Sequence, residues 1–214
     1  MKSAHTHSVY QDKQALIRSV IRPADAVLDI GFWGQGVSVG DPNWVHNLLR
    51  QSAREVYGLD LDFDARKLSP ADHYFKASAE SFDLAKKFDV VFAGDLIEHL
   101  SNPGLFIKAA ARHLKPGGMI VLTTPNCFNL YHLSEKITKR EPTVNPDHTC
   151  YFNEKTLRQL LAKNGVTDVS FASVYSLGVK HERSWKKKGL DLIYAVISRF
   201  TDKYMETLVA IAKP

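Results

Sequence analysis

The chain has 214 residues, which is long enough for one α/β domain with a substantial core and too short for two. Its hydrophobic share of 44% and charged share of 24% are ordinary for a soluble globular protein. The formal net charge of +5 favours anionic partners such as nucleotides, phosphorylated sugars or a lipid surface. No stretch has the apolar length of a membrane span, and we expect no signal peptide. The two cysteines, Cys127 and Cys150, lack metal-ligand spacing. We therefore expect a cytoplasmic protein with reduced thiols.

The chain begins with a predicted N-terminal helix region, residues 1–22. Its first residues are polar, and the pair His5 and His7 is more typical of a frayed terminus than of a metal site, so no metal site is predicted. Apolar residues at helical spacing predict a helix from Asp12 to Arg22. Tyr10, just before this helix, could reach a ligand or serve only in packing.

The next element is a short strand that runs into a glycine-rich turn. Residues Ala26–Ile30 suit a sheet covered on both faces, and Gly31, Gly34 and Gly36 follow with the spacing G-x-x-G-x-G. A dinucleotide site would instead read G-x-G-x-x-G and bind a pyrophosphate, which the carboxylate of Asp29 would repel. The acid before the glycines therefore indicates a ligand with an ammonium group, although a plain turn between strand and helix is the alternative.

This stretch resembles motif I of the class I S-adenosylmethionine-dependent methyltransferases, which usually reads Asp-x-Gly-x-Gly-x-Gly. It has one extra residue between the first and second glycines, and residues 37–40 intervene before the next predicted helix. The resemblance implies S-adenosyl-L-methionine as cofactor and S-adenosyl-L-homocysteine as product. It also implies cofactor contacts from Asp29, Gly31, Phe32 and Gly36.

The second strand is predicted at Glu55–Asp60, after a helix that we expect to be capped by Asp41 and Pro42. Asp60 closes this strand at the position where an acid usually binds the hydroxyls of a ribose. The alternative is an exposed turn aspartate. The family resemblance implies that Asp60 and its neighbour Leu61 contact the cofactor.

A third strand is predicted at 75–80, ending near the same edge of the sheet. In the family an acidic residue followed by a small one flanks the adenine here. Ser78 replaces the acid, so the resemblance implies adenine contacts from Ser78, Ala79 and Glu80.

The fourth strand, Asp89–Ala93, is followed by Asp95-Leu96-Ile97-Glu98-His99-Leu100. This run resembles the fourth motif of small-molecule methyltransferases, such as those of ubiquinone biosynthesis, and it implies cofactor contacts from Asp95 and Leu96. A helix capped by Asn102 and Pro103, a Lys-Pro-Gly-Gly turn and a strand at 119–123 continue the family's pattern.

The last third of the chain is less regular. Residues 127–150 are predicted to form an irregular active-site loop, because Pro142 and Pro146 interrupt any long helix. The segment from His148 to Gly165, with a helix capped by Asn153, is similar to the family's acceptor border. Strands are predicted at 166–174 and 207–212.

A basic and apolar helical insertion is predicted at 176–206, before the last strand. Its segment 183–200 combines a run of basic residues with apolar residues at helical spacing. One interpretation is a covering helix with a solvated lead-in, and the other is a peripheral contact with a membrane or a lipid-linked acceptor.

Together these elements predict a single domain over residues 1–214. The predicted fold class is α/β, a Rossmann-like, doubly wound and mostly parallel sheet with helices on both faces. The resemblance implies seven strands with an antiparallel last strand. Such a sheet binds its ligand at the carboxyl ends of its strands, where the motif residues gather.

The implied reaction is methyl transfer to a small-molecule, sugar or lipid-linked acceptor, and we expect the methylated atom to be a hydroxyl oxygen. A hydroxyl acceptor needs a base, and His99 and His148 are the candidates, although each could be a structural histidine. The stretch from Asp41 to His46 is similar to methyltransferases of surface-polysaccharide assembly. No motif of nucleic-acid methyltransferases is present, so no specific nucleic acid is expected.

Two functions of other classes stay open. A non-catalytic module could bind the cofactor and act at a membrane or partner surface. An NAD-dependent dehydrogenase would share the sheet and Asp60 but would not explain Asp29. The sequence does not decide the oligomeric state.

Overall fold

The computed structural model of the chain describes residues 8–33, 39–69, 73–139, 141–175, 196, 201 and 203–214. Three features of the sequence analysis lie outside these residues. They are the pair His5 and His7, the glycines Gly34 and Gly36 of the predicted cofactor motif, and the basic segment 183–200 apart from Val196.

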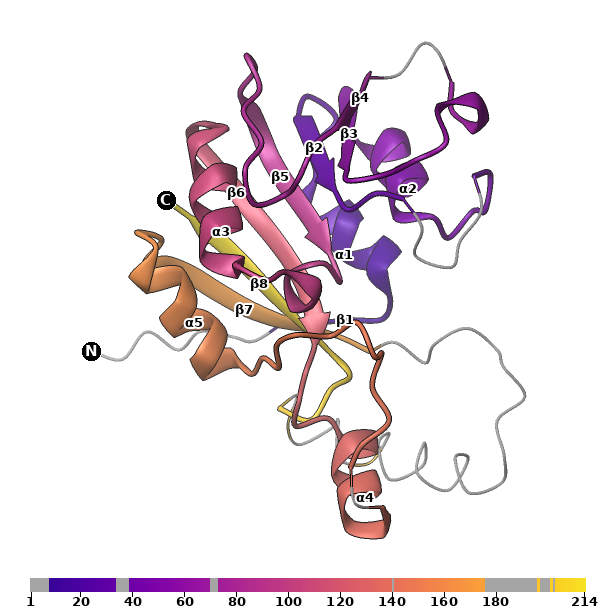
Figure 1. The fold of residues 1–214 in the computed structure, drawn as a ribbon, viewed down its shortest axis with the longest axis vertical. Coiled ribbons are helices and arrows are strands. Elements are labelled where there is room, and N and C mark those ends of the chain that lie inside the picture. Colours follow the sequence, from indigo (N-terminus) through magenta and orange to yellow (C-terminus); the bar gives the residue numbers. More distant parts are fainter. Residues whose placement is uncertain are drawn as a thin grey trace.

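In the described part of the chain, eight strands form one sheet in the order β1-β7-β8-β6-β5-β2-β3-β4 (Figure 1). The pairs are parallel except where β8 runs antiparallel to β6 and to β7, which confirms the predicted antiparallel last strand. The strands are β1 (Ser8–Tyr10), β2 (Ala26–Ile30), β3 (Glu55–Asp60), β4 (His73–Lys76), β5 (Phe88–Gly94), β6 (Leu114–Pro125), β7 (Asp168–Val174) and β8 (Thr207–Lys213).

The strand beyond the expected seven is β1, at one edge of the sheet. It pairs in parallel with β7, with Ser8 opposite Ala172 and Tyr10 opposite Val174. The Tyr10 ring packs against a small apolar cluster that includes Val174, in agreement with its packing interpretation. The prediction of seven strands is wrong because three residues beside a polar terminus show no alternating pattern. Their pairing depends on a partner strand far along the chain.

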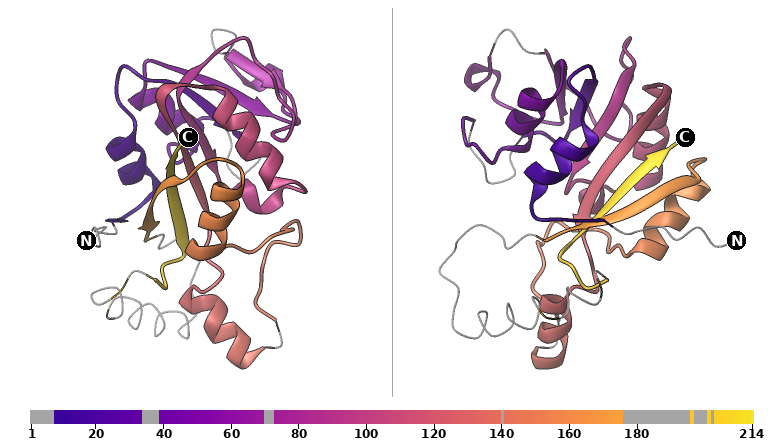
Figure 2. Two further views of the ribbon diagram at one scale, coloured as in Figure 1. Left: turned by 90° about the vertical axis from the view of Figure 1, so that its left-hand side faces the viewer. Right: turned by 180° about the vertical axis from the view of Figure 1, so that it is seen from behind.

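Helices cover both faces of the sheet, as predicted (Figure 2). On one face, α1 (Lys13–Val20) and α2 (Val45–Ser52) pack with Val27 of β2. On the other, α3 (Pro103–Arg112) and α5 (Glu154–Lys163) pack with Leu28 and Ile30 of the same strand. Alternate residues of β2 therefore enter two cores, which explains why its sequence is apolar on both faces.

Side-chain caps explain where two of these helices begin. Asp12 accepts a hydrogen bond from the Ala15 N–H at the start of α1, and Asn153 forms a reciprocal capping box with Thr156 at the start of α5. The expected cap by Asp41 is wrong. Its carboxylate accepts from the Asn43 N–H in a turn, and α2 begins only at Val45.

Two further boundaries differ from the sequence analysis. The predicted irregular loop contains α4 (Leu130–Thr138). Asn129 caps the start of this helix, because its side chain accepts from the His132 N–H. The two prolines follow the end of α4 and therefore do not interrupt it. In Figure 1, α4 stands apart from the sheet, beyond the carboxyl end of β6.

The third predicted strand is also shorter than expected, because β4 ends at Lys76 and residues 79–81 form a turn. Two short 3-10 helices, η1 (Ala65–Lys67) and η2 (Ile97–His99), complete the described elements. No helix in the described ranges has both the length and the apolar character that a membrane span requires.

Candidate active site

Three aspartates stand at the carboxyl ends of neighbouring parallel strands. Asp29 lies in β2, Asp60 ends β3 and Asp95 follows β5, and β2 is hydrogen-bonded to both of the other strands. The ends of these strands meet at the carboxyl-terminal edge of the sheet, which is where open α/β folds bind ligands. Burial, and to a smaller extent the nearby Asp29 carboxylate, raises the pKa of Asp60. Asp29 and Asp60 are therefore close enough for their charges to interact.

The Asp29 carboxylate is not open to solvent. The residue is 2% exposed, and one of its oxygens lies 2.9 Å from Nδ1 of His46, a fully buried residue in the first turn of α2. The His46 ring packs against Phe32, Trp44 and Tyr74. Sequence reasoning did not find this partner, because a histidine on the buried face of a helix is more often a core residue.

Gly31 begins the glycine-rich turn with a φ of +76°, a conformation that side-chain-bearing residues rarely adopt. Its N–H donates to the Leu59 carbonyl at 2.8 Å. A Cβ on Gly31 would lie 2.9 Å from Cδ1 of Leu96, so two residues predicted to contact the cofactor are packed against each other. The backbone here is close to the β5 side of the edge and has no room for a side chain.

Phe32, another predicted cofactor residue, points its ring into an aromatic cluster and is only 3% exposed. Its carbonyl accepts a 2.8 Å hydrogen bond from the indole N–H of Trp44. The side chain thus anchors the turn to the region before α2. The Phe32 side chain is therefore occupied in packing and not directed toward a ligand.

Asp60 connects the end of β3 to the same turn. Its carboxylate accepts from the Trp33 N–H at 2.9 Å and from the Asp62 N–H at 3.3 Å. The next residue, Leu61, is 70% exposed, which is unusual for a large apolar side chain beside a charged edge. Asp60 therefore braces the turn while Leu61 presents an open apolar surface.

Ser78, Ala79 and Glu80 lie in and beside the turn that follows β4. The Ser78 hydroxyl accepts from the Glu80 N–H at 3.2 Å. The Glu80 carboxylate accepts from both the N–H and the side-chain amide of Asn102, at 2.9 and 3.1 Å, which holds the start of α3. These hydrogen bonds lower the pKa of Glu80, and they assign its carboxylate a structural role.

Asp95 has a φ of +49°, the only positive value for a non-glycine residue in the described part of the chain. Its carboxylate forms an ion pair with Nζ of Lys13 at 2.5 Å and accepts from the Thr123 hydroxyl at 2.9 Å. Lys13 comes from the start of α1, so this contact joins the N-terminal region to the end of β5. Neither Lys13 nor Thr123 was identified from the sequence, since no local pattern pairs them with Asp95.

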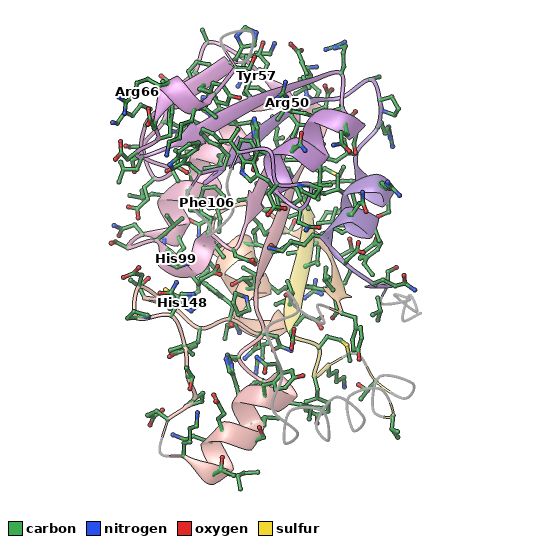
Figure 3. All side chains as sticks on the ribbon, turned by 90° about the vertical axis from the view of Figure 1, so that its right-hand side faces the viewer. Arg50, Tyr57, Arg66, His99, Phe106 and His148 are labelled. Atoms are coloured by element: carbon green, nitrogen blue, oxygen red, sulfur yellow. The ribbon has the colours of Figure 1, made fainter. Side chains whose placement is uncertain are left out.

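Glu98, His99 and His148 meet beyond Asp95. The two imidazole rings lie edge to face with their centroids 4.6 Å apart (Figure 3). Burial, followed by the neighbouring His99, lowers the pKa of His148. Glu98 is 2% exposed, and burial raises the pKa of its carboxyl to about 7. The structure thus brings together the two predicted base candidates with a buried carboxyl that sequence reasoning missed, and three such groups could hold a metal ion.

Comparison with known proteins decides the family. A model described as a methyltransferase domain matches residues 11–170. The chain belongs to this methyltransferase domain family. The predicted resemblance to S-adenosylmethionine-dependent methyltransferases and the predicted Rossmann-like fold class are both confirmed.

Named relatives of this methyltransferase domain include a probable S-adenosylmethionine-dependent methyltransferase of Mycobacterium tuberculosis. It is 29% identical over 134 residues, which cover 60% of this chain and 47% of the relative. A ubiquinone biosynthesis O-methyltransferase of Bartonella tribocorum is 25% identical over 162 residues, 67% of this chain and 64% of that protein. The chain spans about half the length of the mycobacterial relatives that it matches.

Solved structures agree on the fold. A SAM-dependent methyltransferase from Archaeoglobus fulgidus has a TM-score of 0.62 and 19% identity, over 94% of this chain and 93% of that one. The protein DhpI, solved as a complex with SAH, has a TM-score of 0.55 and 13% identity, over 94% of this chain and 83% of that one. At such low identities the likeness shows the fold of the methyltransferase domain and no more.

Proposed function

We propose that this chain is an S-adenosylmethionine-dependent methyltransferase that moves a methyl group to a hydroxyl oxygen of a small-molecule, sugar or lipid-linked acceptor. The observation that carries the proposal is the meeting of two sets of groups at one edge of the sheet. One set is the aspartates Asp29, Asp60 and Asp95, and the other is the histidine pair His99 and His148. The first suits a cationic nucleoside and the second suits an acceptor with a proton to lose.

The residues at the edge fit S-adenosylmethionine. When bound, this cofactor supplies an electrophilic methyl group on a positively charged sulfur. We expect Asp60 to accept from the ribose hydroxyls, because a carboxylate with two oxygens suits two neighbouring donors. The exposed Leu61 beside it offers an apolar face for the adenine. The Ala77 N–H donates to the Asp60 carbonyl at 3.0 Å, so the segment that carries Ser78 and Ala79 begins beside Asp60.

The charge of the edge supports the same assignment. Asp95 is neutralised by its ion pair with Lys13, but Asp29 and Asp60 add two further carboxylates at this edge. Their charge opposes a phosphate group and favours an ammonium or sulfonium group. A dinucleotide such as NAD would bring phosphates to this edge. The charge therefore disfavours the dehydrogenase alternative.

The histidine pair would act on the acceptor. Its edge-to-face contact keeps ring nitrogens of both residues within reach of one small region. The Asp95 carboxylate is near enough to act electrostatically on His148. A neutral imidazole can accept the hydroxyl proton while the acceptor oxygen forms its bond to the methyl carbon and the carbon–sulfur bond breaks. The Bartonella relative is named an O-methyltransferase, which supports an oxygen acceptor.

Two measurements on the purified chain test this function. Titration calorimetry should show binding of S-adenosylhomocysteine and no binding of NAD. Methyl-labelled S-adenosylmethionine, incubated with separated lipid, glycan, RNA and metabolite fractions, should then label a hydroxyl-bearing fraction other than RNA. Absence of heat with both S-adenosylmethionine and S-adenosylhomocysteine would overturn the proposal, whereas binding without any labelled product would favour the non-catalytic module.

A further inference from the structure

Glu98, His99 and His148 form a three-residue cluster just beyond β5. Each side chain offers one potential ligand atom, and these atoms all lie within 4.8 Å of one another. Within the part of the chain that the structure describes, it is the one group of its kind. Figure 3 shows His99 and His148 next to each other, although they come from segments far apart in the sequence.

The buried member of the cluster has an unsatisfied oxygen. Glu98 Oε2 accepts from the Thr124 hydroxyl at 2.9 Å, but Glu98 Oε1 is buried and has no hydrogen-bond partner among the described residues. A carboxylate oxygen withdrawn from water without a partner carries a substantial free-energy cost. A cation between the three side chains would remove this cost.

The backbone holds the cluster together before any ion is bound. Glu98 and His99 are neighbours in η2. The Glu98 carbonyl accepts from the N–H groups of Thr149 and Cys150, at 2.8 and 3.2 Å. The segment that carries His148 is therefore fastened to the residue whose side chain it faces, and this lowers the entropic cost of collecting the ligands.

The cation near the cluster already has a partner. Lys13 forms its ion pair with Asp95. Burial has the largest effect on the pKa of the Glu98 carboxyl and raises it, and Lys13, without a direct contact, is among the smaller influences that lower it. Asp95 and Asp147 are the acidic groups that act on His148, and His99 and His132 are the other imidazoles near it. The groups around the cluster are thus carboxylates, one paired lysine and imidazoles, and imidazoles are metal ligands when neutral.

We propose that Glu98, His99 and His148 bind a divalent transition-metal ion of the zinc class. Two imidazoles and one carboxylate are the protein ligands of many catalytic zinc sites, which keep a fourth position open. Mg²⁺ and Ca²⁺ prefer oxygen ligands, so this donor set disfavours them. Ligand atoms about 2.0–2.1 Å from a tetrahedral ion lie roughly 3.3 Å apart, so the side chains need to close in by at most about 1.5 Å.

Binding of the ion stands by itself, whereas its role rests on the proposed function. An acceptor hydroxyl in the open position would have its pKa lowered by the ion. The O–H bond then breaks and the proton leaves to solvent, while the oxygen lone pair forms the bond to the methyl carbon and the carbon–sulfur bond breaks. The histidines would act as ligands in this case rather than as bases.

The test uses the full chain after treatment with EDTA and dialysis. Titration calorimetry with ZnCl₂ should show binding of a single ion per chain, and Co²⁺ should give the visible absorption bands of a tetrahedral site. MgCl₂ should give no comparable binding. Absence of stoichiometric Zn²⁺ binding would overturn the proposal.

Variants locate the site. His148→Ala and Glu98→Gln should each weaken Zn²⁺ binding at least tenfold and remove the Co²⁺ bands, whereas His73→Ala should change neither, because His73 is exposed on β4. If Glu98→Gln fails to fold by circular dichroism, His148→Ala decides alone, since His148 is only partly buried in a loop. Unchanged Zn²⁺ affinity in His148→Ala would overturn the ligand assignment.

Titration with S-adenosylhomocysteine in parallel separates this proposal from the proposed function. If the chain binds S-adenosylhomocysteine but does not bind Zn²⁺, the metal site is rejected and the methyltransferase function stands. If it binds Zn²⁺ but does not bind S-adenosylhomocysteine, the proposed function is rejected and the metal site stands. Methyl transfer that is equal before and after EDTA treatment would reject the ion's role in the reaction.

Discussion

Nδ1 of His46 lies 2.9 Å from a carboxylate oxygen of Asp29, and both side chains are buried within the α2 face of the sheet. The other ring nitrogen of His46 has no hydrogen-bond partner among the described residues. The pair explains how an acidic residue can occupy a fully covered strand. It also gives Asp29, a residue of the cofactor motif, a fixed orientation.

Removing this partner should destabilise the protein. We expect His46→Leu to lower the free energy of unfolding by about 3 kcal/mol, because it leaves the buried Asp29 carboxylate unpaired. His46→Asn, whose side-chain amide can still donate, should lose less. Urea denaturation of both variants measures the difference, and equal losses would show that the hydrogen bond does not stabilise the fold.

Gly31→Ala should impair both stability and cofactor binding. A positive φ costs a side-chain-bearing residue about 1–2 kcal/mol, and the new Cβ would also press on Leu96. Gly117→Ala is the matched control, because Gly117 has a φ of +79° but nothing within 4 Å of its added Cβ. We expect Gly31→Ala to lose roughly 1 kcal/mol more in urea denaturation, and only this variant to bind S-adenosylhomocysteine more weakly.

Asp60→Ala should weaken binding of S-adenosylhomocysteine at least tenfold. The change removes the acceptor of the Trp33 N–H and, under the proposed function, the partner of the ribose hydroxyls. A charge-assisted hydrogen bond contributes about 1.5–3 kcal/mol, and about 1.4 kcal/mol corresponds to tenfold in affinity.

Asp62→Ala serves as the control for Asp60→Ala. Its side chain is 83% exposed and pairs with Lys76 at the surface. Calorimetric titration should find its affinity for S-adenosylhomocysteine unchanged. A similar loss in both variants would indicate a general effect of charge and not a specific contact.

His148→Ala and His99→Ala should reduce turnover while leaving cofactor affinity unchanged. A base or a metal ligand at the acceptor contributes about a hundredfold or more to the rate, so kcat with the identified acceptor should fall by that factor. The dissociation constant of S-adenosylhomocysteine should stay constant. Normal turnover in both variants would assign the histidine pair a purely structural role.

Much of the fold could be predicted because its signals are local. The strands β2, β3 and β5 are short, mostly apolar segments, and each has an aspartate within one residue of its carboxyl end. The caps at Asp12 and Asn153 lie next to the helices that they start. Edge strand β1 and helix α4 were missed. The first depends on β7 for pairing, and the second ends before Pro142 and Pro146, the two residues on which the prediction of an irregular loop rested.

The sequence by itself determined the family, the type of sheet and the strand ends at which Asp29, Asp60 and Asp95 gather, since these follow from short motifs and from the direction of parallel strands. Only the tertiary structure decided the partners of these groups. His46 is 17 residues from Asp29, Lys13 is 82 from Asp95, and Thr124 is 26 from Glu98. Such contacts depend on how separate elements pack, and no periodic pattern within one element encodes them. The contact of His148 with His99 and the buried Glu98 is likewise a long-range contact that only the tertiary structure shows.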